Sequence, residues 1–160
     1  MSKTSKSAVG QQAVSPRVVK LPKYLDDRVE EEANRLGLNG SQYIAKVLFQ
    51  ALEMEEDVRL LLLESVADLV RPHRGSYGRH ITRTIFREIQ ANQAVMDLYE
   101  QAFRDDDGNL DEKRKGVVNR QIGKTVLLVL GAKKDGRMDG PLDKDELIKS
   151  YAFLIPKDDE

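Results

Sequence analysis

The chain has 160 residues, of which 40% are hydrophobic, and it contains no cysteine. This length allows one ordinary hydrophobic core, or a small core joined to a module that completes its own core by dimerising. The lack of cysteine excludes a disulfide framework and a thiolate metal site, and it fits a reducing cytoplasm. No run reaches the ~18 apolar residues of a membrane span, and no apolar run follows the first lysines as in a secretion signal. We therefore expect a soluble cytoplasmic protein without a membrane partner.

The formal net charge is only −1, but the charges are unevenly distributed. Residues 1–24 carry five basic side chains and no acidic one: Lys3, Lys6, Arg17, Lys20 and Lys23. Residues 26–32 then carry five acids and one arginine. This boundary is typical of a module with one face toward phosphate and the other toward solvent. For residues 1–14 alone, a tail whose lysines only aid solubility is an equally good interpretation.

The first ordered segment is predicted to be a single strand. Residues 1–15 are rich in Ser, Lys, Gln and Thr, and we expect them to form a flexible basic arm. Arg17 to Leu21 is a short run with two valines that Pro22 closes, which predicts a strand. No hairpin partner follows it in the sequence. The strand must therefore pair outside this segment.

Two helices are predicted after Pro22. The first has apolar residues at the spacing of one helical face: Leu25, Val29, Ala33 and Leu36. Gly37 is suited to a left-handed C-cap, and Asn39-Gly40-Ser41 offers capping oxygens to a second helix. The apolar side of that helix carries Tyr43, Ile44, Val47, Leu48 and Ala51. A unit spanning residues 16–52 is too small to bury these faces alone, so we expect it to dimerise.

The remaining sequence predicts a helical domain. Helices are expected over residues 58–70, 81–103, 111–130 and 143–154. The helix over residues 58–70 should be largely buried, and either a separate helix or a continuation of the one before it fits its sequence. The fold class is thus mainly α. We divide the chain into a flexible basic arm (1–15), a DNA-binding and dimerisation module (16–53) and an all-helical C-terminal domain of unknown role (54–160).

The segment VVKLPKYLDDRVEEEANRLGLNGSQYIAKVLFQAL carries a family resemblance. It has a strand that ends in Leu-Pro, a helix that ends in Leu-Gly-Leu, and a second helix that a serine begins. In these features it resembles the ribbon-helix-helix family of DNA-binding proteins. The resemblance covers residues 16–52, about a quarter of the chain.

The resemblance implies an intertwined homodimer that binds double-stranded DNA. In the family, the strands of two subunits pair antiparallel, and the resulting ribbon enters the major groove. Alternation along the strand then places Val19 and Leu21 in the dimer core, with Val18 and Lys20 toward the bases. Lys20 can donate to guanine O6 or N7, whereas Val18 can only contact a thymine methyl or exclude a wrong base.

Phosphate contacts are expected at the end of the strand and at the start of the second helix. At the strand end, Arg17 would turn outward, and Lys23 follows it. The family also binds phosphate through the start of its second helix, which here consists of Asn39, Gly40 and Ser41. Gly40 departs from the basic residue that many relatives carry, which removes one contact. Capping of the helix is the alternative role of Asn39 and Ser41.

A second basic cluster lies between Arg71 and Arg87, where there are five arginines, two histidines and no acid. Arg79, Arg83 and Arg87 share one helix face and form a candidate secondary basic face for DNA. Internal ion pairs, for example with the acids at residues 105–107, are the favoured alternative. The two histidines, separated by a loop, do not predict a metal site. No nucleophile with a base partner is evident, so an enzyme is the class least expected.

The sequence from Asp135 to Glu146 partly matches a calcium-binding loop. Arg137, however, occupies a position where an oxygen ligand is needed. We favour an Asp-Gly turn followed by a helix that Asp143 and Glu146 cap, and calcium binding is the minor alternative. No metal or cofactor is expected.

The function predicted from sequence is that of a sequence-specific DNA-binding transcriptional regulator, a repressor, acting as a homodimer or a higher oligomer. Two alternatives stay open. One is an accessory DNA-binding protein of plasmid transfer or partition. The other is an antitoxin-like interaction scaffold, in which the C-terminal domain binds a protein partner.

Overall fold

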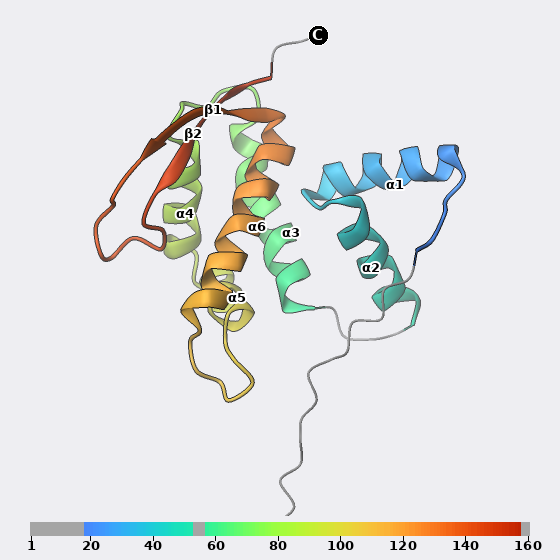
Figure 1. Ribbon diagram of the computed structural model, residues 1–160, viewed down its shortest axis with the longest axis horizontal. Helices are drawn as coiled ribbons and strands as arrows, with labels where there is room; N and C mark the ends of the chain where they lie inside the picture. The colour runs from blue at the N-terminus through green and yellow to red at the C-terminus, as the bar shows by residue number, and fades with distance from the viewer. Residues whose placement is uncertain (1–17, 53–56, 158–160) are drawn as a thin grey trace, which may run out of the picture.

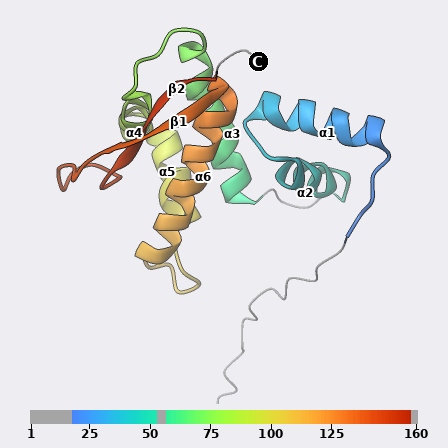
Figure 2. The same cartoon turned by 45° about the horizontal axis from the view of Figure 1, so that its top comes forward.

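The computed structural model describes residues 18–52 and 57–157, and within them the fold is mainly α. The elements are α1 Lys23–Leu36, α2 Gly40–Ala51, α3 Val58–Val70, a short 3-10 turn Arg71–His73, α4 Ile81–Ala91, α5 Gln93–Ala102, α6 Glu112–Leu130, β1 Ala132–Asp139 and β2 Tyr151–Pro156. Helices α3 to α6 form a bundle. The α1–α2 pair lies on one side of this bundle and the β1–β2 hairpin on the other (Figures 1 and 2).

The two N-terminal helices are confirmed, together with the signals that predicted them. Gly37 closes α1 in the left-handed conformation, with φ of 72°. Asn39 begins α2 with a reciprocal capping box: its side chain accepts from the Gln42 amide, and the Gln42 side chain accepts from the Asn39 amide. The predicted strand is not seen. Residues 18–21 belong to no helix or strand, and Arg17 lies outside the described residues.

The glycine turn between α1 and α2 is anchored in the helical bundle. The Thr125 hydroxyl of α6 donates to the Gly37 carbonyl at 2.8 Å, in a buried position. The flanking residues Ala33 and Leu38 are completely buried in the main core. A partly buried ion pair between Lys46 and Glu64, 2.9 Å apart, links α2 to α3. The first two helices therefore pack on the bundle within one chain.

The bundle follows the sequence prediction except at Asn92. Helix α3 buries Leu60, Leu62, Leu63, Val66, Ala67 and Val70, as its apolar run predicted. The predicted helix over residues 81–103 is instead two helices, because Asn92 leaves the helical conformation and caps α5 by accepting from the Val95 amide. Helix α6 is confirmed, capped by Asp111 and closed by the left-handed Gly131. No described helix combines the length and the apolar character that a membrane crossing needs.

The prediction of an all-helical C-terminal domain is wrong, because the chain ends in an antiparallel β hairpin. Ala132 pairs with Pro156 and Asp139 with Tyr151, and the register shifts between Lys134 and Met138. The predicted helix over residues 143–154 is therefore absent. Residues 143–146 make only a turn, in which the Glu146 amide donates to the Asp143 carbonyl at 3.1 Å. Aromatic and β-branched residues in YAFLIP favour a strand, and this preference outweighs the helix-capping pattern that precedes it.

We expect Gly37→Ala to lower the free energy of unfolding by about 2–4 kcal/mol, because strain at positive φ and overpacking add together. A methyl group at Gly37 would lie 2.8 Å from the Ala67 Cβ and the Thr125 Cγ2, and 2.9 Å from the Val129 Cγ2. Gly75→Ala is the matched control, since Gly75 has φ of 85° but no atom within 4 Å of the added carbon. Urea unfolding of both variants measures the difference. Equal losses would mean that the turn is not packed as described.

Candidate nucleic-acid interface

The predicted base-reading segment is exposed. Val18 and Lys20 both lie at the surface, and Lys23 is the first residue of α1. Lys20 and Lys23 form no ion pair with any described residue. Figure 1 shows this segment in blue, at the end of α1 that points away from the bundle. Val19, predicted to face the dimer core, is 68% exposed in the single chain.

A set of exposed apolar side chains is shared by this segment and the first two helices. We call it the α1–α2 apolar face, and its exposed members are Val19, Leu25, Val47, Leu48 and Leu52. The other side of α2 is occupied, because Tyr43, Ala45 and Phe49 pack against the main core. Helix α2 thus has two apolar sides, of which the bundle covers one.

The start of α2 brings together three of the five residues predicted to bind phosphate. Asn39 is engaged in the capping box, and Ser41 is exposed. Gly40 is buried, and a Cβ there would collide with the Glu30 carboxylate of α1. This acid therefore lies at the positive end of the α2 dipole. A phosphate at the same place would have to approach a negative charge, which sequence reasoning did not reveal.

The second basic cluster is joined to the hairpin loop by ion pairs. The Nη2 atoms of Arg83 and Arg87 lie 2.6 Å and 2.7 Å from the Glu146 Oε1. Hydrogen bonds from Arg83 and then Arg87 lower the pKa of Glu146, whose side chain is only 7% exposed. The guanidinium of Arg79 instead lies over the Phe153 ring, 5.1 Å from its centroid.

The expected acids at residues 105–107 are not the partners of this cluster. Among them, Asp106 pairs with Arg114 at 3.2 Å, at the start of α6. The favoured internal ion pairs are thus present, but Glu146 provides them. Because Arg83 and Arg87 hold the hairpin loop against α4, they are less available to DNA than an unpaired basic face would be.

Three acids of the calcium-like motif are engaged in other contacts. The carboxylate of Asp135 accepts from Arg137 at 2.7 Å, which lowers the pKa of Asp135. Asp139 accepts from the Tyr151 hydroxyl at 2.8 Å, and Glu146 holds the two arginines of α4. Across residues 18–52 and 57–157, no group of three or more His, Cys, Asp or Glu side chains is placed to hold a metal ion.

Both histidines take part in hydrogen bonds between elements. The Nε2 of His73 lies 2.8 Å from the Glu88 Oε1. The Nδ1 of His80 lies 2.6 Å from the hydroxyl of Tyr151, which also donates to Asp139. Burial raises the pKa of Tyr151, and its bond to Asp139 raises it further. This chain of contacts joins the start of α4 to both strands. The sequence did not predict it, because its pattern placed Tyr151 in a helix over residues 143–154.

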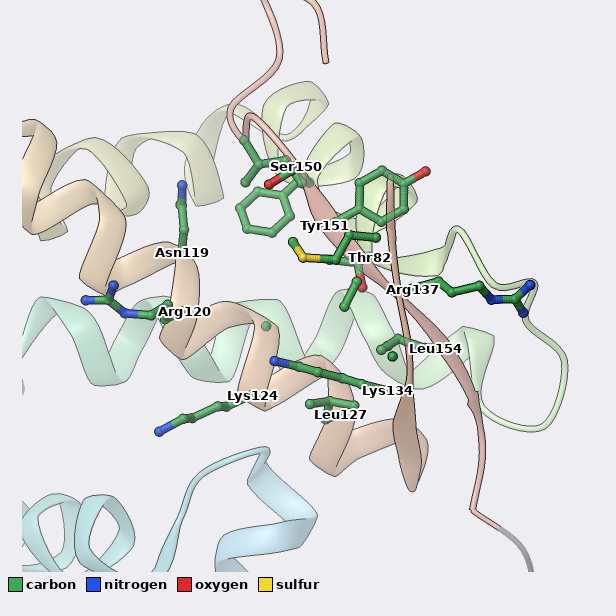
Figure 3. A pocket seen from close by; sticks show the side chains of 16 residues that line it. Thr82, Asn119, Arg120, Lys124, Leu127, Lys134, Arg137, Ser150, Tyr151 and Leu154 are labelled. Atoms are coloured by element: carbon green, nitrogen blue, oxygen red, sulfur yellow. The ribbon is translucent and has the colours of Figure 1, made fainter. Parts of the chain in front are cut away.

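A groove that the sequence did not predict lies between α4, α6 and the hairpin. We call it the basic groove, and its volume is about 440 Å³. Four cationic residues line it, and no acid does: Arg120, Lys124, Lys134 and Arg137. Figure 3 shows Lys134 reaching from the hairpin toward α6, with Arg120 and Lys124 spaced along that helix and Arg137 directed away from it.

We expect Glu146→Gln to lower the free energy of unfolding by about 1–3 kcal/mol at neutral pH, because two charge-assisted hydrogen bonds are weakened. The pKa of Glu146 is depressed in the folded state, so its contribution is present at neutral pH and disappears as the pH falls through that lowered pKa. The difference between the two proteins should shrink below about pH 4. Urea unfolding at several pH values measures it.

Glu112→Gln is the control for this prediction. Glu112 is 74% exposed and lies 3.6 Å from Lys115, so its loss should have an effect below about 0.5 kcal/mol. A penalty for Glu146→Gln that is the same at pH 3 and pH 7 would contradict the proposed ion pairs.

Comparison of the chain with protein-family models, with curated proteins and with solved structures found no match. Its function must therefore be inferred from its own residues.

Proposed function

We propose that this protein is a homodimeric regulator that binds double-stranded DNA in a sequence-specific way. One strand from each subunit would pair into a β-ribbon that enters the major groove. The observation that carries this proposal is the uncovered α1–α2 apolar face. Several large exposed apolar side chains on one small module are typical of interaction sites in soluble proteins.

A second copy of the chain would complete both the strand and the apolar face. Residues 18–21 have no strand partner and no backbone hydrogen bond to another described residue, so they can pair with the same segment of another copy. Val19 would then turn into the interface. Leu48 and Val47 would be covered by the partner, while Phe49 remains on the bundle. The two apolar sides of α2 thus have different partners.

The ribbon would present its other side to DNA. Lys20, which is exposed and without an ion pair to any described residue, is proposed to donate to a guanine edge. Val18 contributes shape, and Lys23 a phosphate contact. We expect a smaller contribution from Asn39 to Ser41, because the Glu30 carboxylate lies beside Gly40. A dimer bound to a promoter in this way would act as a repressor by preventing other proteins from binding the same DNA.

The dimer interface is tested by Leu48→Glu. We expect the wild-type chain to sediment as a dimer and the variant as a monomer, because the carboxylate would lose its hydration in the interface. DNA binding should be lost with the dimer. Leu110→Glu is the control, since Leu110 is 55% exposed and Leu48 is 53% exposed, but Leu110 lies in the loop before α6.

Sedimentation velocity at several concentrations distinguishes the outcomes, and circular dichroism checks that both variants are folded. A monomeric wild-type protein, or a Leu48→Glu variant that still dimerises, would show that this face has another role.

The base contact is tested by comparing Lys20→Ala with Lys23→Ala on a site selected from random duplexes. We expect Lys20→Ala to cost about 1–3 kcal/mol on the selected site and much less on random DNA, because a lost base contact reduces discrimination. Lys23→Ala should weaken both equally and reduce the salt dependence, because phosphate contacts release counterions.

Titrations at several salt concentrations measure both effects. If Lys20→Ala retains wild-type affinity and selectivity, the ribbon does not read bases as proposed.

A further inference from the structure

The basic groove has the shape and composition of a small-molecule site. Its volume of about 440 Å³ falls within the range that is common for ligand pockets, roughly 300–1,000 Å³. Apolar side chains line it from α4, α6 and the hairpin. Phe86 and Leu154 are almost completely buried, so the apolar surface open to a ligand comes mainly from Leu127 of α6 and Met138 of β1. The hydroxyl-bearing residues Thr82 and Ser150 add polar groups. The groove can therefore receive a molecule with both an apolar body and a polar group.

The charges in the groove specify the sign of that polar group. Arg120, Lys124 and Lys134 form no ion pair with any described residue, whereas Arg137 is neutralised by Asp135. Arg120 and Lys124 are four residues apart on α6, so their charges repel each other. Lys134 brings a third cation from the facing strand (Figure 3). An anion would relieve this repulsion and gain charge-assisted hydrogen bonds.

The absence of a side chain at one position of α6 leaves space for a ligand. Gly123 lines the groove in the middle of this helix, and a Cβ added there would meet no atom within 4 Å. Glycine in a helix interior is about 1 kcal/mol less favourable than alanine. The missing side chain thus has a cost in stability and leaves open space beside Lys124.

We infer that the basic groove binds a small organic anion with an apolar body, held by Arg120, Lys124 and Lys134. Nucleic acid fits less well, since a phosphate backbone has nothing to place against Leu127 and Met138. The groove is lined by α4, α6 and the hairpin, and the hairpin lies on the side of the bundle away from the α1–α2 pair that carries the proposed ribbon (Figures 1 and 2). This inference does not depend on the proposed DNA binding.

The test uses the full chain and 8-anilinonaphthalene-1-sulfonate, a fluorescent organic anion with an apolar body. We expect saturable binding at one site per chain. Gly123→Leu should reduce affinity at least tenfold, because the new side chain fills the groove. Leucine forms helices better than glycine, so this variant should unfold no more easily than the wild type.

Gly116→Leu is the matched control. Gly116 lies seven residues earlier on the same helix face, also has no atom within 4 Å of an added Cβ, and does not line the groove. It should gain the same helix propensity and keep wild-type affinity for the dye. Equal affinity of the Gly123→Leu and Gly116→Leu variants would place the dye elsewhere and overturn the inference.

The requirement for charge is tested by the double variant Arg120→Gln with Lys124→Gln. It should weaken binding of the sulfonate at least tenfold but leave binding of N-phenyl-1-naphthylamine, a neutral dye of similar shape, within about twofold. Equal losses for both dyes would show that the cations do not select an anion. Displacement of the sulfonate by a short DNA duplex, lost in Gly123→Leu, would identify the groove as a nucleic-acid contact. Absence of saturable binding to the wild type would also overturn the inference.

Discussion

The arrangement of this protein depends on the contact between the Gly37 turn and the helices beneath it. A residue at this corner needs positive φ and no side chain, because Ala67, Thr125 and Val129 lie within 3 Å of where a Cβ would stand. The hydrogen bond from Thr125 to the Gly37 carbonyl fixes the corner in a dry environment. This contact determines which sides of α1 and α2 face the bundle and which stay open.

On the other side of the bundle, ion pairs help to fix the position of the hairpin. The hairpin loop packs Ile148 into the core, with Leu142 and Leu147 against it. Glu146 also holds the loop to α4 through Arg83 and Arg87. Because the carboxylate is nearly buried while Arg87 is well exposed, the contact remains partly hydrated and depends on the ionised form of Glu146. The hairpin in turn forms one wall of the basic groove.

The sequence was sufficient for elements that local signals define. Gly37 and Gly131 end their helices in the left-handed conformation, and Asn39 caps the next helix, as their residue types predict. Asn92 is a capping residue as well, but it lies within a continuous apolar pattern, and the break it makes was missed. The turn at residues 143–146 has the composition of a helix start, and that signal concealed the strand preference of YAFLIP, which the burial of Tyr151 and Leu154 reinforces.

Features that depend on contacts between residues far apart in the sequence were harder to predict. The partner of Arg83 lies 63 positions away, and it could not be chosen from several acids while the hairpin was unknown. The basic groove has the same origin, since Lys134 reaches α6 only because the chain turns back at Gly131. The β-ribbon remains a prediction, because it needs a second chain.

Helix α6 is shared by the two halves of the molecule. Gly123 and Lys124 line the basic groove, while Thr125, the next residue, holds the Gly37 turn. A helix moves as a nearly rigid rod, so a molecule that displaces this part of α6 would also displace the anchor of α1 and α2. Thermodynamic linkage makes such coupling reciprocal: a ligand that favours one position of α6 alters binding at the N-terminal helices, and occupancy there alters affinity in the groove by the same factor.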